Sequence, residues 1–176
     1  MKRRSARFTS LVLLGTSALA LVGCSDDDAD AGDDVLDVTL TDFSFGELPD
    51  EVPAGTRLQI ENRSSSELHE LVAVRLADDD DREVSEIVQD GIEEVLSSGP
   101  PTAVILEAPG GEPITAVGDG VLHEPGRYLL VCTIPTGADP AEYLDASAAS
   151  GGRPQVDGGE PHFAHGMIDD LVVTDA

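Results

Sequence analysis

The feature that most constrains the fold of this chain is a series of short stretches in which apolar and polar residues alternate. Leu36, Val38 and Leu40 share one face of the first stretch, and Leu58 and Ile60 alternate with polar neighbours in the second. A period of two residues is that of a β-strand with one buried face. Because turn residues such as Pro and Gly separate the stretches, the sequence predicts an all-β domain.

Further strands and one helix complete the predicted pattern. Phe43 and Phe45 continue the first stretch in the opposite phase, which predicts a strand with a kink. A helix is expected over residues 82–97, where apolar residues are spaced for one helical face. The other expected strands cover residues 68–76, 103–106, 114–117, 126–133 and 171–173. Several short strands with one inserted helix are typical of a Greek-key β-sandwich. Between Thr133 and Pro161 the sequence predicts a long loop with a helical turn over residues 141–144.

The N-terminus has the features of an export signal. Lys2, Arg3, Arg4 and Arg7 precede an apolar stretch over residues 11–21, which is too short to span a bilayer. After it, residues 24–34 are rich in Asp and have too little apolar surface to fold, so we expect a disordered acidic tether there. Residues 35–176 are then long enough for a single domain with its own core.

The end of the leader, Leu21-Val22-Gly23-Cys24, resembles the lipobox of bacterial lipoproteins. The resemblance implies a signal peptide over residues 1–23 and lipidation of Cys24. It also implies that a lipid anchor holds the protein at the extracytoplasmic face of the cell membrane. The alternative is ordinary secretory cleavage near Ala20, which would leave Cys24 as a free thiol.

The charge of the chain excludes some partners. Its 35 acidic and 10 basic residues give a formal net charge of −25, and the leader carries four of the basic residues and none of the acidic ones. Such a chain repels nucleic acid and anionic lipid surfaces, so no nucleic-acid partner is expected. We expect a monomer.

Apart from Cys24, Cys132 is the one cysteine of the sequence, and it ends a strand-like run. A lone thiol in an exported protein is a free reactive group, an intermolecular partner or a metal ligand. His69 stands at the start of the third strand, and His162 and Met167 follow near the C-terminus. Two imidazoles, a thiolate and a weak thioether are the donors of a blue-copper centre. Taken singly, each residue also fits an ordinary place in a strand, core or loop.

With these residues in place, the sequence resembles the cupredoxin family, to which the plastocyanins and azurins belong. The matching pieces, in the order of the family, are Phe43-Ser44-Phe45, residues 52–62, Leu68-His69-Glu70-Leu71-Val72, residues 125–132, His162, and Gly166-Met167 with residues 171–173. The resemblance implies a cupredoxin-like Greek-key sandwich. It also implies one copper ion held by His69, Cys132, His162 and Met167, and a one-electron carrier with a redox partner protein.

One departure from the family pattern concerns the ligand loop. Cupredoxins usually place a few residues between the thiolate and the second histidine, whereas 29 residues separate Cys132 from His162. A long insertion weakens the rigidity that a tight loop provides, although loop-closure entropy costs only about 0.6 kcal/mol for each doubling of length. His165 is the rival to His162, but it lies closer to Met167 than the family spacing implies. His123 has no motif support.

Three functions remain open at the level of sequence. The first is a copper-dependent electron carrier, the second a copper storage or delivery protein, and the third a metal-free domain that binds a protein or envelope partner. Zinc is an alternative to copper for the same donors. An enzyme is not expected, since the sequence lacks a His-x-His pair and the patterns of a Ser/His/Asp triad or a metalloprotease.

Overall fold

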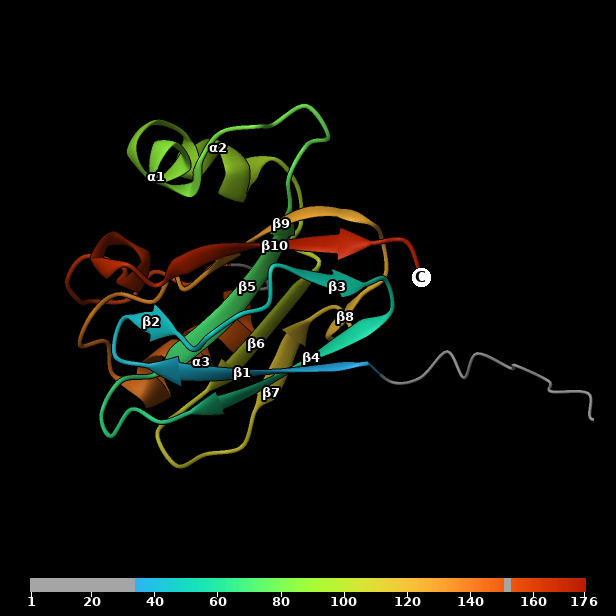
Figure 1. Cartoon of the computed structure of the whole chain (residues 1–176). Coiled ribbons are helices and arrows are strands. Elements are labelled where there is room, and N and C mark those ends of the chain that lie inside the picture. The colour runs from blue at the N-terminus through green and yellow to red at the C-terminus, as the bar shows by residue number, and fades with distance from the viewer. Residues whose placement is uncertain (1–33, 151–152) are drawn as a thin grey trace, which may run out of the picture. The chain divides into compact units, whose positions relative to one another are not determined.

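The alternating stretches form the strands of two sheets in the computed structural model, which describes residues 34–150 and 153–176 (Figure 1). The predicted signal peptide, Cys24 and the tether up to Asp33 lie outside the described residues. Within the described part of the chain, no helix is long and apolar enough to cross a membrane.

The four-stranded sheet has the order β2-β1-β4-β8. Its strands are β1 (Val35–Thr41), β2 (Ser44–Phe45), β4 (Thr56–Asn62) and β8 (Val121–Leu122). β1 runs parallel to β4, and buried and exposed residues alternate along all of β4, as the sequence predicts. The expected kink after β1 is instead a tight turn, because β2 pairs back on β1 in antiparallel register. Phe43 stands in this turn with a φ of 63°, a left-handed conformation that few residues other than glycine adopt.

The six-stranded sheet has the order β3-β10-β9-β5-β6-β7. Its strands are β3 (Glu51–Pro53), β10 (Ile168–Thr174), β9 (Gly126–Val131), β5 (His69–Arg75), β6 (Ala103–Glu107) and β7 (Ile114–Val117). β5 and β9 pair with each other in the middle of this sheet. Both sheets contain neighbouring strands that are not consecutive in the chain, such as β5 beside β9 and β1 beside β4, which is the connectivity of a Greek key.

Both faces of β5 and β9 are covered, which explains why these strands are apolar runs rather than alternating ones. Leu71 and Leu130 belong to the core between the two sheets. Val72 and Leu129, one position along each strand, belong to a second core on the outer face of the six-stranded sheet. We call these two sides the inner face and the outer face.

Helical segments cover parts of the outer face. Residues 84–97 form α1 (Val84–Glu86), a π-helical turn η1 (Ile87–Gly91) and α2 (Ile92–Ser97), where a helix is predicted. Ile87, Ile92 and Val95 of this segment pack in the outer core. A further helix, α3 (Pro140–Ser150), occupies much of the segment expected as a long loop, where only one helical turn is predicted. The predicted Greek-key β-sandwich is confirmed, with this helix as an addition.

Candidate metal centre

Three of the four predicted ligands come together from three different elements. His69 begins β5, Cys132 follows β9, and His162 begins the short 3-10 helix η2 (His162–His165). None of the three is exposed to solvent, and one donor atom from each lies within 4.8 Å of the others. His162 Nδ1 lies 3.1 Å from His69 Nδ1 and 3.3 Å from Cys132 Sγ. The two imidazoles therefore turn the same ring nitrogen toward one shared point beside the sulfur.

The long segment between Cys132 and His162 is closed at its base. An isolated bridge pairs Pro135 with Pro161, and the backbone N–H of His162 donates to the carbonyl of Ile134 at 2.9 Å. The N–H of Phe163 donates to the carbonyl of Cys132 at 3.0 Å. These bonds hold the two ligand residues side by side whatever the length of chain beyond them, so the insertion does not loosen the site.

Met167 is tied by its backbone to two of the other candidates. Its carbonyl accepts from the N–H of Cys132 at 3.1 Å, and its own N–H donates to the carbonyl of His162 at 3.1 Å. Gly166 makes the second bond possible, because its φ of 111° reverses the chain directly after η2. The Met167 side chain is fully buried in the same core cluster as Cys132. Its role as an axial ligand stays a prediction.

The outward nitrogens of both imidazoles face carboxylates. His162 Nε2 lies 3.4 Å from Glu67 Oε2, and His69 Nε2 lies 3.9 Å from Asp42 Oδ1. Both nitrogens are buried and lack a hydrogen-bond partner among the described residues. A metal-ligating histidine commonly directs its second nitrogen to a carboxylate, which fixes the ring and raises its basicity. Asp42 and Glu67 occupy that supporting position here.

Burial keeps the three donors neutral in the absence of a cation. It lowers the pKa of His69 to about 4, with His162 as a second cause, and it also lowers the pKa of His162. The same burial, with Glu70 nearby, raises the pKa of the Cys132 thiol far above its usual range. Neutral imidazoles are the form that binds metals. A thiolate is stable at this depth only beside a cation, which ligation to a metal would provide.

The spacing of the donors fits one metal ion. Bonds of about 2.0 Å to nitrogen and about 2.3 Å to sulfur place neighbouring donors about 3 to 3.5 Å apart. The two measured separations, 3.1 Å and 3.3 Å, lie in this range. A thiolate with two imidazoles suits copper and also zinc, whereas magnesium and calcium prefer oxygen donors.

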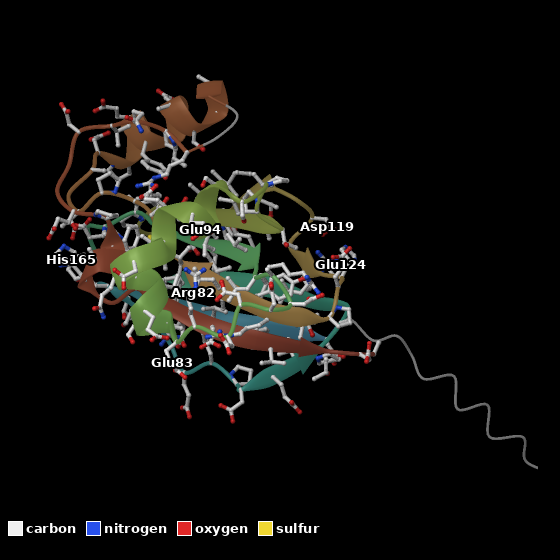
Figure 2. The ribbon with its side chains drawn as sticks, turned by 90° about the horizontal axis from the view of Figure 1, so that it is seen from above. Arg82, Glu83, Glu94, Asp119, Glu124 and His165 are labelled. Carbon is white, nitrogen blue, oxygen red and sulfur yellow. The ribbon has the colours of Figure 1, made fainter. Side chains whose placement is uncertain are left out.

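Phe43 covers the centre from the β1–β2 turn. Its ring lies edge-on to His162, with 5.1 Å between the ring centroids, and its centroid lies 4.9 Å from that of His165. His165 is exposed and lies outside the three-donor cluster. His123 is exposed and pairs with Asp119 at 2.9 Å. Figure 2 shows Asp119 at the opposite end of the sandwich from His165.

The sequence offers little warning of Phe43, because nothing local indicates that it folds over a histidine more than a hundred residues away. Phe163 is the aromatic residue next to His162 in the sequence, but it does not supply this cover. It packs in the outer core instead. The cover over the centre therefore comes from a different element.

Glu70 is a buried carboxylate that the sequence also signals, since it interrupts the apolar run of β5. It follows His69 and lies on the outer face, where the backbone N–H of Thr133 donates to Glu70 Oε1 at 3.0 Å and the Thr133 hydroxyl donates at 2.6 Å. Tyr143 of α3 donates to Oε2 at 3.3 Å. The backbone N–H of Glu70 itself donates to Cys132 Sγ at 3.5 Å. Burial raises the pKa of Glu70 despite these donors.

Solved structures similar to this chain include three auracyanins. One, from the photosynthetic bacterium Roseiflexus castenholzii, is 21% identical with a TM-score of 0.45, and the match covers 82% of this chain and 98% of that protein. Auracyanin B is 19% identical with a TM-score of 0.39 over 80% of this chain and 88% of its own. Auracyanin A, a "blue" copper protein from Chloroflexus aurantiacus, is 15% identical with a TM-score of 0.39 over 80% and 99%.

No family model and no curated protein matches this chain. The two-sheet sandwich with its buried His–Cys–His cluster is consistent with a cupredoxin, as the sequence predicts.

Proposed function

We propose that this chain is a copper protein that carries single electrons. The main support is the buried triangle of His69 Nδ1, Cys132 Sγ and His162 Nδ1, whose spacing fits one metal ion with a soft donor. Met167 is the fourth, weak donor in this proposal, giving a type 1-like site for one copper ion.

The chain supplies a rigid and dry environment. Copper, when bound, alternates between Cu(I) and Cu(II). The backbone bonds that join Cys132, His162 and Met167 hold the donors in one arrangement for both states. The backbone N–H of Glu70 donates to Cys132 Sγ and so stabilises negative charge on the sulfur. Since the donors are fully buried, little water has to reorganise when the charge of the site changes.

Full burial favours electron transfer over copper storage or delivery. A delivery site exchanges its ion through an accessible ligand, whereas none of the three donors is exposed. An electron can cross covering side chains that an ion cannot. Phe43 contacts both the buried His162 and the exposed His165, so these three rings form an aromatic route from the centre to the surface.

We further propose that a redox partner docks at the His165 surface, and that the protein is held at the extracytoplasmic face of the cell membrane by lipidated Cys24. The leader and its Leu21-Val22-Gly23-Cys24 end support the anchor. Mass spectrometry of the N-terminal peptide from membranes should find acylated Cys24 with residues 1–23 removed. A soluble protein with a free Cys24 thiol would contradict the anchor and leave the copper site unaffected.

Titration of the purified mature chain with Cu(II) tests the copper site. We expect an intense thiolate charge-transfer band that saturates at one copper per chain and is bleached by a mild reductant. Cys132→Ser is the control and should lack the band. Copper binding without the band in the unaltered chain would exclude Cys132 as a ligand. Metal analysis of protein purified from its native membrane, without added copper, then separates copper from zinc.

A further inference from the structure

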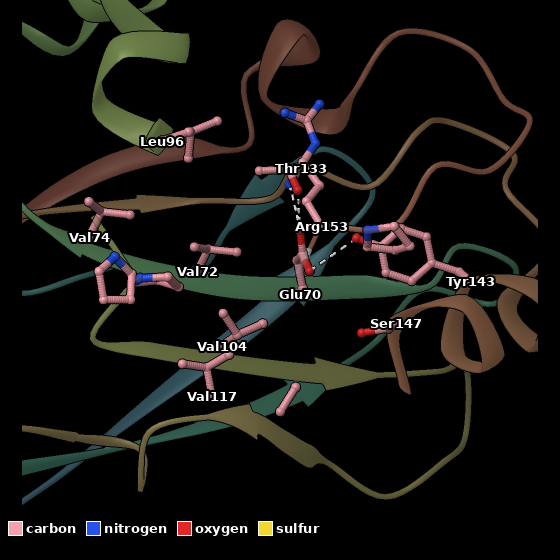
Figure 3. A pocket seen from close by; sticks show the side chains of 14 residues that line it. Glu70, Val72, Val74, Leu96, Val104, Val117, Thr133, Tyr143, Ser147 and Arg153 are labelled. Carbon is pink, nitrogen blue, oxygen red and sulfur yellow. Dashed lines mark hydrogen bonds between the residues drawn. The ribbon is translucent and has the colours of Figure 1, made fainter. Parts of the chain in front are cut away.

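A cavity of about 440 Å³ lies on the outer face of the six-stranded sheet, separate from the metal centre on the inner face. Its floor consists of apolar side chains from β5, β6 and β7, among them Val72, Val104 and Val117. Leu96 of α2 and Tyr143 of α3 line its sides (Figure 3). This volume lies within the range of cavities that hold small organic molecules, about 300 to 1,000 Å³.

Among the polar residues that line this cavity, Glu70 has a buried carboxylate and is only 3% exposed. Figure 3 shows its bonds to Thr133 and Tyr143, with the apolar side chains of the floor beside it. A carboxylate has about four acceptor positions. Two donors from Thr133 occupy Oε1, and Tyr143 is the one described donor to Oε2. Glu70 Oε2 therefore has the capacity to accept one more hydrogen bond.

The charges around the cavity favour a neutral ligand. Arg153 lines the cavity, and its positive charge acts on Glu70. The same guanidinium lies 3.5 Å from Glu93. An anionic ligand would be repelled by Glu70, and a cationic one would meet the positive charge of Arg153. A neutral hydrogen-bond donor meets neither penalty.

We propose that this cavity binds a neutral, mainly apolar molecule of the phenol or alcohol class, whose hydroxyl group donates to Glu70 Oε2. The apolar body of the ligand rests on Val72, Val104 and Val117, and burial of that body supplies most of the affinity. The hydroxyl supplies the specificity, because a site with a buried acceptor discriminates against an analogue that cannot donate. This inference goes beyond the proposed electron carrier and does not depend on bound copper.

Binding of two matched probes to the metal-free mature chain tests the proposal. 2-Naphthol has a donor hydroxyl, whereas 2-methoxynaphthalene has the same rings without a donor. Because the chain has no Trp, the fluorescence of either probe can be followed over a weak protein background. We expect one 2-naphthol per chain and an affinity at least about tenfold higher than for 2-methoxynaphthalene. Equal affinities, or no binding of 2-naphthol at millimolar concentration, would overturn the proposal.

Val117→Phe fills part of the floor and should weaken 2-naphthol binding by at least about tenfold. Ile114→Phe is the matched control, since Ile114 lies on the same strand, is 50% exposed and does not line the cavity. Equal loss in both variants, or no loss in Val117→Phe, would contradict the site.

Amide NMR of the unaltered chain provides an answer that needs no variant. 2-Naphthol should shift the signals of Glu70, Thr133 and Tyr143, and shifts confined to other regions would place the ligand elsewhere. A chain that fails to bind copper but shows these shifts would refute the electron carrier alone.

Discussion

Polar groups are buried on both the inner and the outer face of the β5–β9 pair, but their interaction partners differ. On the inner face, His69, Cys132 and His162 direct their donors at one another, and the buried Nε2 atoms of both histidines lack hydrogen-bond partners among the described residues. On the outer face, Glu70 accepts hydrogen bonds from Thr133 and Tyr143. In the proposed copper protein a cation would complete the inner group, whereas the hydrogen bonds of the protein itself largely satisfy the outer group.

Burial shifts the pKa values of two neighbouring residues on β5 in opposite directions. Burial lowers the pKa of His69 and raises the pKa of Glu70, because in each case it favours the neutral form. A neutral imidazole is the form that binds a metal. The alternation of side chains along one strand thus places two buried groups of different function at consecutive positions.

The largest effect should come from removing an inner-face ligand. His162→Ala deletes the donor that lies close to both of the others. It should lower the affinity for Cu(II) more than about a hundredfold, with loss of the thiolate band. His165→Ala is the control, since His165 is exposed and outside the cluster; it should keep the band and slow electron exchange instead. Loss of tight binding in the His165 variant alone would reverse the assignment.

In the metal-free chain, His69 on the inner face and Glu70 on the outer face should make the free energy of unfolding depend on pH in opposite directions. The pKa of His69 falls from 6.5 to about 4 on folding, so its contribution is present above about pH 6.5 and lost as the pH falls toward 4. Glu70 has a raised pKa, so its contribution is present below 4.5 and lost as the pH rises through the folded-state value.

Urea unfolding at several pH values measures both contributions. Relative to the unaltered chain, His69→Gln should reduce the loss of unfolding free energy on acidification by an amount on the order of 2 kcal/mol. Glu70→Gln should have the opposite effect and increase the loss of unfolding free energy on acidification. If both substitutions change the slope of unfolding free energy against pH in the same direction, the two faces do not depend on pH in opposite ways.

Replacing Met167 should tune the inner face without emptying it. Met167→Leu nearly conserves volume in a fully buried position, so the free energy of unfolding should change by less than about 1.5 kcal/mol. Copper should be retained, and the reduction potential should rise because a donor to the oxidised metal is lost. Voltammetry checks the potential. An unchanged potential would indicate that the Met167 sulfur does not reach the metal.

The smallest effect is expected on the outer face. Tyr143→Phe removes one long hydrogen bond to Glu70 and should cost about 1 kcal/mol of unfolding free energy. The thiolate band should keep its position, since the lost hydrogen bond ends at Glu70 and not at one of the three donors. A displaced band of reduced intensity would show that α3 helps to hold the metal centre, and would weaken the distinction between the faces.

Much of the fold could be predicted from sequence because its signals are local. The alternation in β4 and the apolar run of β5 identify these strands, and the helical spacing of residues 82–97 identifies the segment that covers the outer face. The two-residue strand β8 was missed, because so short a run carries no period. The length of α3 was underestimated, since its apolar residues are only weakly segregated to one face; Tyr143 is its one deeply buried residue among those whose burial is described.

The candidate site also contains residues that could be predicted from sequence and others that depend on contacts between distant parts of the chain. His69, Cys132 and His162 could be chosen by residue type and order, and the structure brings them together. The base of the insertion could not be foreseen, because the hydrogen bond between Ile134 and His162 depends on a pairing across 28 positions. Asp42, Phe43 and Glu67 reach the centre from turns whose direction is set by the packed sheets.

X-ray absorption at the copper edge of the loaded protein tests the central claim most directly, because it counts the donor atoms around the metal. The account predicts one sulfur and two imidazole nitrogens in the first coordination shell, from Cys132, His69 and His162. In the Cys132→Ser variant the short sulfur contribution should disappear. A first shell of nitrogen and oxygen alone in the unaltered chain would contradict the assignment of this buried triangle as the copper site.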